Sequence, residues 1–129
     1  MAVPDGLPSD VVQFVNDSID SIEQLELLVM LINSSHRYWD AASAGRALGL
    51  NAGTTQRDLE RLATRNLLAV NLGNDVSYRF GPGSPRLRAT SEAFAAAYRN
   101  DPRALFRLVA ERQKRAVRNF ADAFRIRRK

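Results

Sequence analysis

The residues of this sequence best suited to chemistry are arginines and threonines in one short segment. Arg57 and Arg61 are four positions apart, so in a helix they would be neighbours on the same face. Thr54 and Thr55 come just before them, where hydroxyl groups and free backbone N–H groups at a helix start can hold a phosphate. Arg65 follows one turn later and would meet the backbone of a polyanion. These residue types at this spacing predict a surface that binds nucleic acid, through guanine edges or through phosphates alone.

Asp58 weighs against this interpretation because it is an acid placed among the arginines. On a surface that faces DNA, an acid must pair with an arginine or accept a hydrogen bond from cytosine. The alternative is that Arg57, Asp58 and Arg61 form an ordinary salt-bridged helix surface. Arg79, in a later segment, is a further candidate for contact with a phosphate. The sequence leaves both interpretations open.

Catalysis and metal binding have little support in the composition. The sequence has a single histidine, His36, and no cysteine, which excludes disulfides and thiolate zinc sites. No paired carboxylates lie in an apolar segment that would raise a pKa, and no glycine-rich nucleotide loop is present. We therefore expect no enzyme activity, no catalytic residue, no metal site and no cofactor, with His36 in a surface loop.

Three helices are expected to position the arginine segment. Their predicted spans are residues 21–33, 40–49 and 51–66. Ser21 opens a capping box, Asp40 is a good N-cap, and Gly49 tolerates the left-handed conformation that follows a helix. In the third helix an apolar inner face recurs at spacings of three and four, formed by Leu59, Leu62 and Ala63.

Two strands are expected to follow these helices. Residues 67–72 and 76–80 alternate apolar and polar side chains, as the strands of a half-buried hairpin do, and residues 73–75 form its turn. Residues 37–39 are expected as a short third strand. It contains Trp39, the only tryptophan, which we expect to be a core anchor rather than a platform for a base or cofactor.

The segment LGLNAGTTQRDLERLATRNLLAV, residues 48–70, resembles the turn, recognition helix and first wing strand of bacterial MarR-like winged-helix regulators. Such proteins usually have Gly-Leu-Leu before the wing, and this chain has Asn66-Leu67-Leu68. Asparagine tolerates a positive φ, as glycine does. The C-terminal FADAFRIRRK also resembles the end of bacterial proteins that contain this domain.

The resemblance implies a mainly α fold with a small β-hairpin. It divides the chain into an N-terminal arm with a short helix (1–20), a winged helix-turn-helix (21–81), and C-terminal helices with a basic tail (82–129). It implies a DNA-binding transcriptional regulator whose helix 54–65 enters the major groove of double-stranded DNA. The DNA-binding residues would be Thr54, Thr55, Arg57, Arg61, Arg65 and Arg79.

The C-terminal segment is expected to form two helices, one from Ser84 to about Arg99 and one from Pro102 to about Arg125. The second is either continuous or interrupted near Gln113. A helix this long needs a partner for its apolar side. We expect homodimerisation through these helices, and the alternative is that the helix folds back on its own chain. The tail residues Arg125, Arg127, Arg128 and Lys129 are expected to be solvated and to attract phosphates without regard to sequence.

Charge is distributed unevenly along the chain, which has a net charge of +5. Residues 1–36 contain six acids and no lysine or arginine, whereas residues 102–129 contain ten basic residues and two acids. A basic excess at one end favours a polyanionic partner, nucleic acid before membrane, although a well-solvated surface helix has the same composition. Nothing resembles a signal peptide, and the longest apolar stretch, 27–32, is too short for a membrane span. We expect a cytoplasmic protein without membrane contact.

A protein-interaction module is the competing function for the same fold. The expected wing tip, 73–75, carries no lysine or arginine, Asp58 opposes phosphate binding, and the N-terminal third is acidic. A winged helix that has lost DNA readout would show these features.

Overall fold

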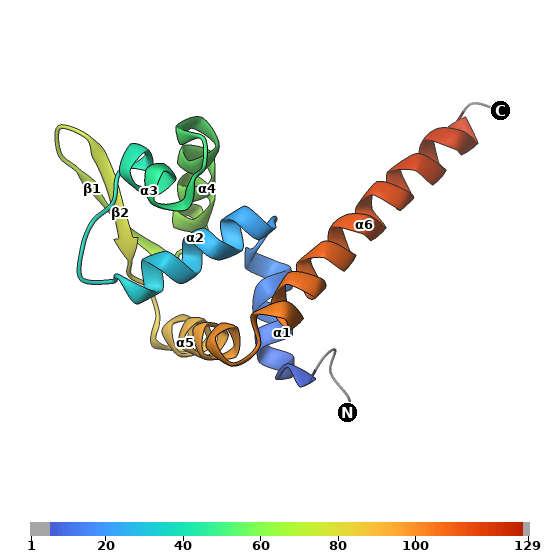
Figure 1. Cartoon of the computed structure of the whole chain (residues 1–129), viewed down its shortest axis with the longest axis horizontal. Coiled ribbons are helices and arrows are strands. Elements are labelled where there is room, and N and C mark those ends of the chain that lie inside the picture. Colours follow the sequence, from blue (N-terminus) through green and yellow to red (C-terminus); the bar gives the residue numbers. More distant parts are fainter. Residues whose placement is uncertain (1–5, 128–129) are drawn as a thin grey trace.

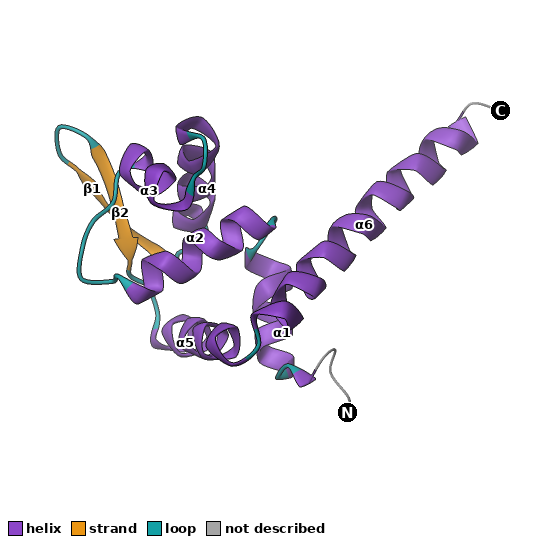
Figure 2. Ribbon diagram, in the orientation of Figure 1, coloured by secondary structure: helices purple, strands orange, loops and turns teal. Residues whose placement is uncertain are grey.

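Six helices and one β-hairpin make up the part of the chain that the structure describes (Figures 1 and 2). The structure is a computed structural model, and it describes residues 6–127, with side chains through residue 121. In chain order the elements are α1 (Ser9–Ser18), α2 (Ile22–Asn33), α3 (Ala41–Leu48), α4 (Ala52–Thr64), β1 (Leu68–Leu72), β2 (Val76–Phe80), α5 (Pro85–Asn100) and α6 (Pro102–Arg127).

Side chains cap the starts of α2, α3, α4 and α5, with the predicted caps Ser21 and Asp40 at α2 and α3. Ser21 accepts a hydrogen bond from the backbone N–H of Gln24 at 3.1 Å, and Asp40 accepts one from Ser43 at 2.7 Å. Asn51 caps α4, and Ser84 caps α5 ahead of a proline at the first helical position. Each cap satisfies a backbone donor that a helix start leaves without a partner.

Two residues with left-handed backbone conformation end the second and third predicted helices. Gly49 has φ +70° after α3, and Asn66 has φ +68° after α4. The expectation that Asn66 adopts a positive φ at this position is confirmed. Gly83 lies so close to this turn that a Cβ on it would overlap the Asn66 side chain. A larger residue at position 83 would therefore make the Asn66 side chain move.

The hairpin is antiparallel, with a register that runs from Leu68 opposite Phe80 to Leu72 opposite Val76. The expected third strand is reduced to one residue, because only Trp39 forms a bridge to it, exchanging backbone hydrogen bonds of 2.7 and 2.8 Å with Tyr78. The Trp39 indole N–H donates to Ser34 Oγ at 3.0 Å, and its ring packs against the core. The prediction of Trp39 as a core anchor is confirmed, although the side chain is only partly buried.

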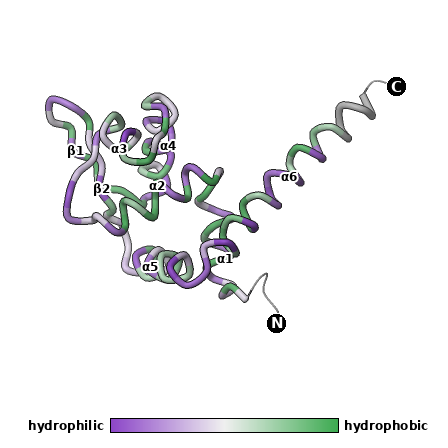
Figure 3. The backbone as a smooth tube through the Cα atoms, viewed as in Figure 1, coloured by the Kyte–Doolittle hydropathy of each residue, from purple (hydrophilic) through white to green (hydrophobic). Residues whose placement is uncertain are grey.

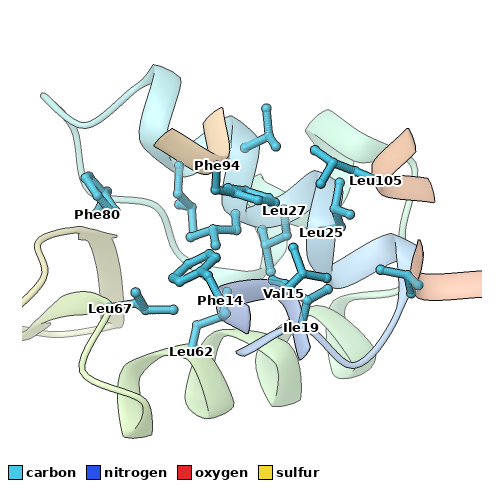
Figure 4. Close-up of a cluster of buried hydrophobic side chains, with 14 of the residues drawn as sticks. Phe14, Val15, Ile19, Leu25, Leu27, Leu62, Leu67, Phe80, Phe94 and Leu105 are labelled. Atoms are coloured by element: carbon cyan, nitrogen blue, oxygen red, sulfur yellow. The ribbon is translucent and has the colours of Figure 1, made fainter. Parts of the chain in front are cut away.

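The core lies around α2, which runs between α3 and α4 on one side and α5 on the other (Figure 1). Figure 3 shows hydrophobic residues along α2 and the inner turns of its neighbours. The N-terminal helix α1 contributes to this core, because Val11, Phe14 and Val15 are buried. The ring of Phe14 lies 5.3 Å from that of Phe94 in α5, and Figure 4 shows both rings within the buried cluster.

The hairpin is buried at its base and exposed at its tip. Leu68, Tyr78 and Phe80 are buried, but on the same face Leu72 is 79% exposed. The alternation of side chains thus predicts the two strands correctly and overstates their burial. The helices pack against the base of the hairpin and do not reach its tip.

Helix α6 has no break at residue 113. It extends away from the body on the side opposite the hairpin (Figure 1). Its first turns are anchored by Leu105 and Val109, which are fully buried, and by the ring of Phe106 against Tyr98. From residue 114 through 121 every side chain is exposed, and Val117 is 69% exposed. The helix folds back on its own chain only over its first half. The basic residues expected as a tail, 125 and 127–129, lie outside the described side chains, as does Phe124.

No helix in the described range is both long and apolar enough to cross a membrane.

Candidate nucleic-acid interface

The outward face of α4 is formed by the residues that the helix turns away from the core. Leu59 and Leu62 are fully buried, as predicted, and hold the opposite face against the body. The exposed positions are Ala52, Gly53, Thr54, Arg57, Glu60, Arg61 and Thr64. Among the described residues, Arg57 has no hydrogen bond or ion pair, so its guanidinium is available to a ligand. It is the centre of the candidate interface.

The two threonines at the start of α4 differ in accessibility. Thr54 is exposed, whereas Thr55 is fully buried and its hydroxyl donates to the Asn51 carbonyl at 2.8 Å. The prediction that the Thr55 side chain contacts a phosphate is therefore wrong. Gly45 of α3 packs closely against this turn, because a Cβ on it would lie 2.8 Å from the Leu50 carbonyl oxygen and 3.2 Å from the Thr55 hydroxyl. Thr55 supports the turn between the helices rather than the interface.

The free backbone donors at the start of α4 are partly occupied. The Asn51 side-chain oxygen accepts from the N–H groups of Gly53 and Thr54 at 2.8 and 3.2 Å. A phosphate at this helix start would have to displace this cap, since the same N–H groups would be its partners.

Arg61 and Arg65 both bind one carboxylate, that of Asp20. Arg61 Nη1 lies 3.0 Å from Asp20 Oδ2, and Arg65 Nη2 lies 3.1 and 3.0 Å from the two carboxylate oxygens. Partial burial by itself raises the pKa of Asp20, but the hydrogen bonds and charges of the two arginines outweigh it and leave the pKa below its ordinary value. Asp20 therefore remains ionised at neutral pH.

The two arginines differ in how firmly the protein holds them. The Arg65 side chain is 29% exposed, and its Nη1 also donates to the Ser18 carbonyl at 2.6 Å and to Gln24 Oε1 at 3.3 Å. The Arg61 side chain is 61% exposed and its described contacts are to Asp20 alone. Arg65 is thus a structural residue in this arrangement, and Arg61 is a surface residue with one tether.

Asp58 lies on the inner flank of α4 and not on the outward face. Its Oδ1 accepts a hydrogen bond from Gln24 Nε2 at 3.3 Å, and its Oδ2 is buried with no hydrogen-bond partner in the described chain. Burial raises the pKa of Asp58, and the bond from Gln24 and the charge of Arg61 only partly offset this. The expectation that Asp58 faces the groove, paired with an arginine or a cytosine, is corrected, because its hydrogen bond comes from the buried Gln24.

A short connection, residues 18–21, joins α1 to α2, and we call it the α1–α2 junction. Arg112 of α6 donates to the backbone carbonyls of Val15, at 3.0 Å, and Ile19, and Gln113 donates to the Asp20 carbonyl at 3.2 Å. Helix α1 has no basic residue in its last turn. Side chains from α4 and α6 satisfy carbonyls at and just past its end instead, a favourable place for cations.

The hairpin contains one basic residue, Arg79. Arg79 is exposed on β2, and its guanidinium lies 4.9 Å from the centre of the Tyr38 ring. The turn at the wing tip, 73–75, carries an acid, Asp75, and no base. In the described part of the chain no group of three or more histidine, aspartate or glutamate side chains could hold a metal ion.

Sequence reasoning located Arg57 and Arg61 on the outward face but missed Asp20 as the partner of Arg61 and Arg65, and Gln24 as a partner of Arg65 and Asp58. Asp20 is 41 positions from Arg61 and 45 from Arg65. The only local signal was the acid that precedes the capping box: Gln24 accepts from the backbone N–H of Asp20, at 2.7 Å, and holds Asp20 at the start of α2.

No protein-family model matches the sequence, and no curated protein is significantly similar to it. Three solved structures have a similar fold. One is RV1404 from Mycobacterium tuberculosis, with 22% identity over 89% of this chain and 79% of that chain and a TM-score of 0.52. Another is the adhesin competence repressor of Streptococcus pyogenes, with 11% identity over 90% and 87% and a TM-score of 0.50.

The third is a homodimeric winged helix-turn-helix DNA-binding domain from Mycobacterium bovis, a possible ArsR-family regulator, with 20% identity over 69% of this chain and 76% of that chain and a TM-score of 0.49. At these identities the likeness concerns the fold, and it confirms the predicted class, a winged helix-turn-helix with helices added at the C-terminus. The MarR-like assignment and the resemblance of the C-terminal tail stay predictions.

Proposed function

We propose that this chain is a DNA-binding transcriptional regulator that inserts the outward face of α4 into a major groove. The observation that carries the proposal is Arg57, an exposed guanidinium with no partner in the described chain, on the face of α4 opposite the buried leucines. A guanidinium so placed can bind the O6 and N7 atoms of guanine with two hydrogen bonds. The similar fold of a streptococcal repressor supports this use.

In the proposed complex the other predicted contacts have different roles. Thr54 and Arg61 flank Arg57 and would contact phosphates, and Arg79 on the wing would contact the backbone of an adjacent groove. Arg65 would act through its internal bonds, which hold α4 against the α1–α2 junction. In this proposal residues 21–81 bind DNA, and the segment 82–129 joins two such units.

The proposal includes homodimerisation through α6. Residues 106, 110, 113, 117, 120 and 124 recur at alternating spacings of four and three, the seam spacing of a coiled coil, and all but Gln113 are phenylalanine, alanine or valine. Among the described side chains of this stripe, Phe106 is partly buried and Val117 is 69% exposed. A second copy offers the same stripe and would cover it.

The test compares Arg57→Gln with Arg99→Gln, which removes the same charge from an exposed position on α5. A preferred sequence is first selected from random duplexes with the wild-type protein. We expect Arg57→Gln to lower affinity for that sequence by about tenfold to a hundredfold, the equivalent of one lost bidentate base contact, and affinity for random DNA by only a few-fold. Arg99→Gln should weaken both slightly and equally.

Two outcomes would contradict parts of this proposal. Equal losses on both DNAs with Arg57→Gln would make Arg57 a phosphate contact without a part in sequence recognition. Failure of the wild-type protein to bind any duplex at low salt would remove the DNA-binding function altogether.

A protein-interaction module remains the second candidate, and the hairpin tip favours it. Leu72 is 79% exposed, with Val70 and Val76 beside it on the same face of the hairpin at 43% and 41%. Such an apolar tip next to Asp75 is better suited to an apolar protein surface than to phosphates.

A further inference from the structure

We propose that Asp20 competes with DNA phosphate for Arg61, so that the protein binds DNA less tightly than its α4 surface allows. The inference rests on the proposed function, because it concerns the same face of α4. Arg61 lies one helical turn from Arg57 and is 61% exposed on its side chain, yet its guanidinium is held by a carboxylate of its own chain at 3.0 Å. A carboxylate and a phosphate oxygen accept the same N–H donors from arginine.

The structure favours release of Arg61 over release of Arg65. Arg65 keeps two further acceptors, the Ser18 carbonyl and Gln24 Oε1, when it loses Asp20. Arg61 has a single acceptor among the described residues, and the Asp20 side chain is itself 38% exposed. Ion pairs between exposed side chains are worth little in water. A phosphate that approaches Arg57 can therefore take Arg61 without disturbing the junction.

Asp20 does not need to move for this exchange. Its carboxylate stays bound to Arg65 through both oxygens, and its backbone N–H stays bound to Gln24. Only the Arg61 side chain rotates, from the junction toward the outward face of α4. Free protein therefore presents one arginine on this face, and DNA-bound protein presents two.

The experiment uses the full chain and random-sequence duplex DNA, titrated at several salt concentrations. The variant Asp20→Asn removes the competing charge but keeps a side chain of the same size. The control Glu23→Gln removes the same charge from an exposed neighbour with no bond to Arg61. The double variant Asp20→Asn with Arg61→Gln asks whether any gain depends on Arg61. Asp20→Ser is the second way of removing the carboxylate if the asparagine variant does not fold.

We expect Asp20→Asn to bind random DNA about threefold to tenfold more tightly than wild type. Its plot of log affinity against log salt should keep the slope of wild type, because Arg61 contacts a phosphate in both complexes. Glu23→Gln should bind slightly more tightly, with an unchanged slope. The gain of Asp20→Asn should disappear when Arg61→Gln is added, and Arg61→Gln alone should weaken DNA binding a few-fold and lower the salt slope by about one phosphate contact.

Three results overturn the inference and leave the proposed function intact. They are a gain no larger than that of Glu23→Gln, a loss of affinity in folded Asp20→Asn, and a gain that persists without Arg61. If neither wild type nor any variant binds DNA at low salt, the proposed function itself fails, which is a distinguishable outcome.

Discussion

Asp58 and Gln24 show how one buried contact changes the role expected of a charged side chain. Asp58 faces α2, accepts one hydrogen bond from Gln24, and leaves its second oxygen buried with no partner among the described residues. Burial makes the ionised form costly, so the pKa of Asp58 lies above the ordinary value of 3.8. Folding therefore favours the protonated form of this side chain.

A stability measurement across pH tests this environment. Because the pKa of Asp58 is raised by folding, its contribution to stability is largest below pH 3.8 and is lost as the pH rises through the folded pKa. We expect Asp58→Asn to gain stability relative to wild type between about pH 3.5 and pH 7. The gain should stay under about 1 kcal/mol, because the side chain is only partly buried.

Urea unfolding of both proteins at the two pH values measures the difference. Asp75→Asn, at the exposed turn of the hairpin, is the control. If the difference between Asp58→Asn and wild type is the same at both pH values, folding does not raise the pKa of Asp58.

Single residues with local roles were the most predictable from the sequence. The caps at Ser21 and Asp40 and the left-handed turns at Gly49 and Asn66 depend on a few neighbouring residues, so local rules suffice. Asp20 could not be assigned in this way. Its partners are set by how α4 packs against α1 and α2, which no local pattern encodes.

Backbone carbonyls at the C-terminal end of α1 accept hydrogen bonds from side chains of other helices. Arg65 of α4 donates to the Ser18 carbonyl, and Arg112 of α6 donates to the carbonyls of Val15 and Ile19. The α1–α2 junction is therefore a contact shared by α4 and the projecting helix α6. The last turn of α1 contains no basic residue that could replace either arginine as a donor.

Arg112→Gln should lower the free energy of unfolding by about 1–3 kcal/mol, because it removes charged donors from two carbonyls on a partly buried surface. Arg118→Gln, on the exposed part of the same helix, should change it by less than about 0.5 kcal/mol. Denaturant unfolding with a spectroscopic probe is sufficient. Equal stabilities of the two variants would show that the end of α1 does not depend on Arg112.

Helices and strands were predictable where their apolar residues recur at regular spacing. The leucines of α4 and the alternation in both strands identify the elements, but a pattern does not show what covers them. The tip of the hairpin is exposed, and residues 37–39 contribute a single bridge. Both features depend on how the helices pack against the hairpin, which the alternation of side chains does not determine. For α6, the sequence left open a break near Gln113, and the structure has none.

The shape of the whole molecule follows from α6. At about 1.5 Å per residue the part beyond residue 113 extends roughly 20 Å from the body. In this part of the stripe the Val117 side chain is exposed. In the proposed dimer this part of the helix pairs with its copy and sets the distance between two DNA-facing surfaces.

Val117→Glu should dissociate that dimer, because it places a charge in the seam. Light scattering coupled to size exclusion should give the mass of a single chain, 14.4 kDa, for the variant and about twice that for wild type. Asn119→Glu introduces the same charge away from the stripe and should leave the mass unchanged. A wild-type protein that stays monomeric at high concentration, or a variant that stays dimeric, would exclude pairing through this stripe.

The position of Trp39 between the hairpin and the helices makes it useful as a fluorescent probe. It is the only tryptophan in the chain, and it joins the hairpin to the helices through its backbone bonds to Tyr78 and its indole bond to Ser34. The Arg37 guanidinium lies 3.6 Å from the centre of its ring. The fluorescence of Trp39 should therefore report whether the hairpin keeps its contacts with the helices when a ligand binds. This measurement needs no attached dye.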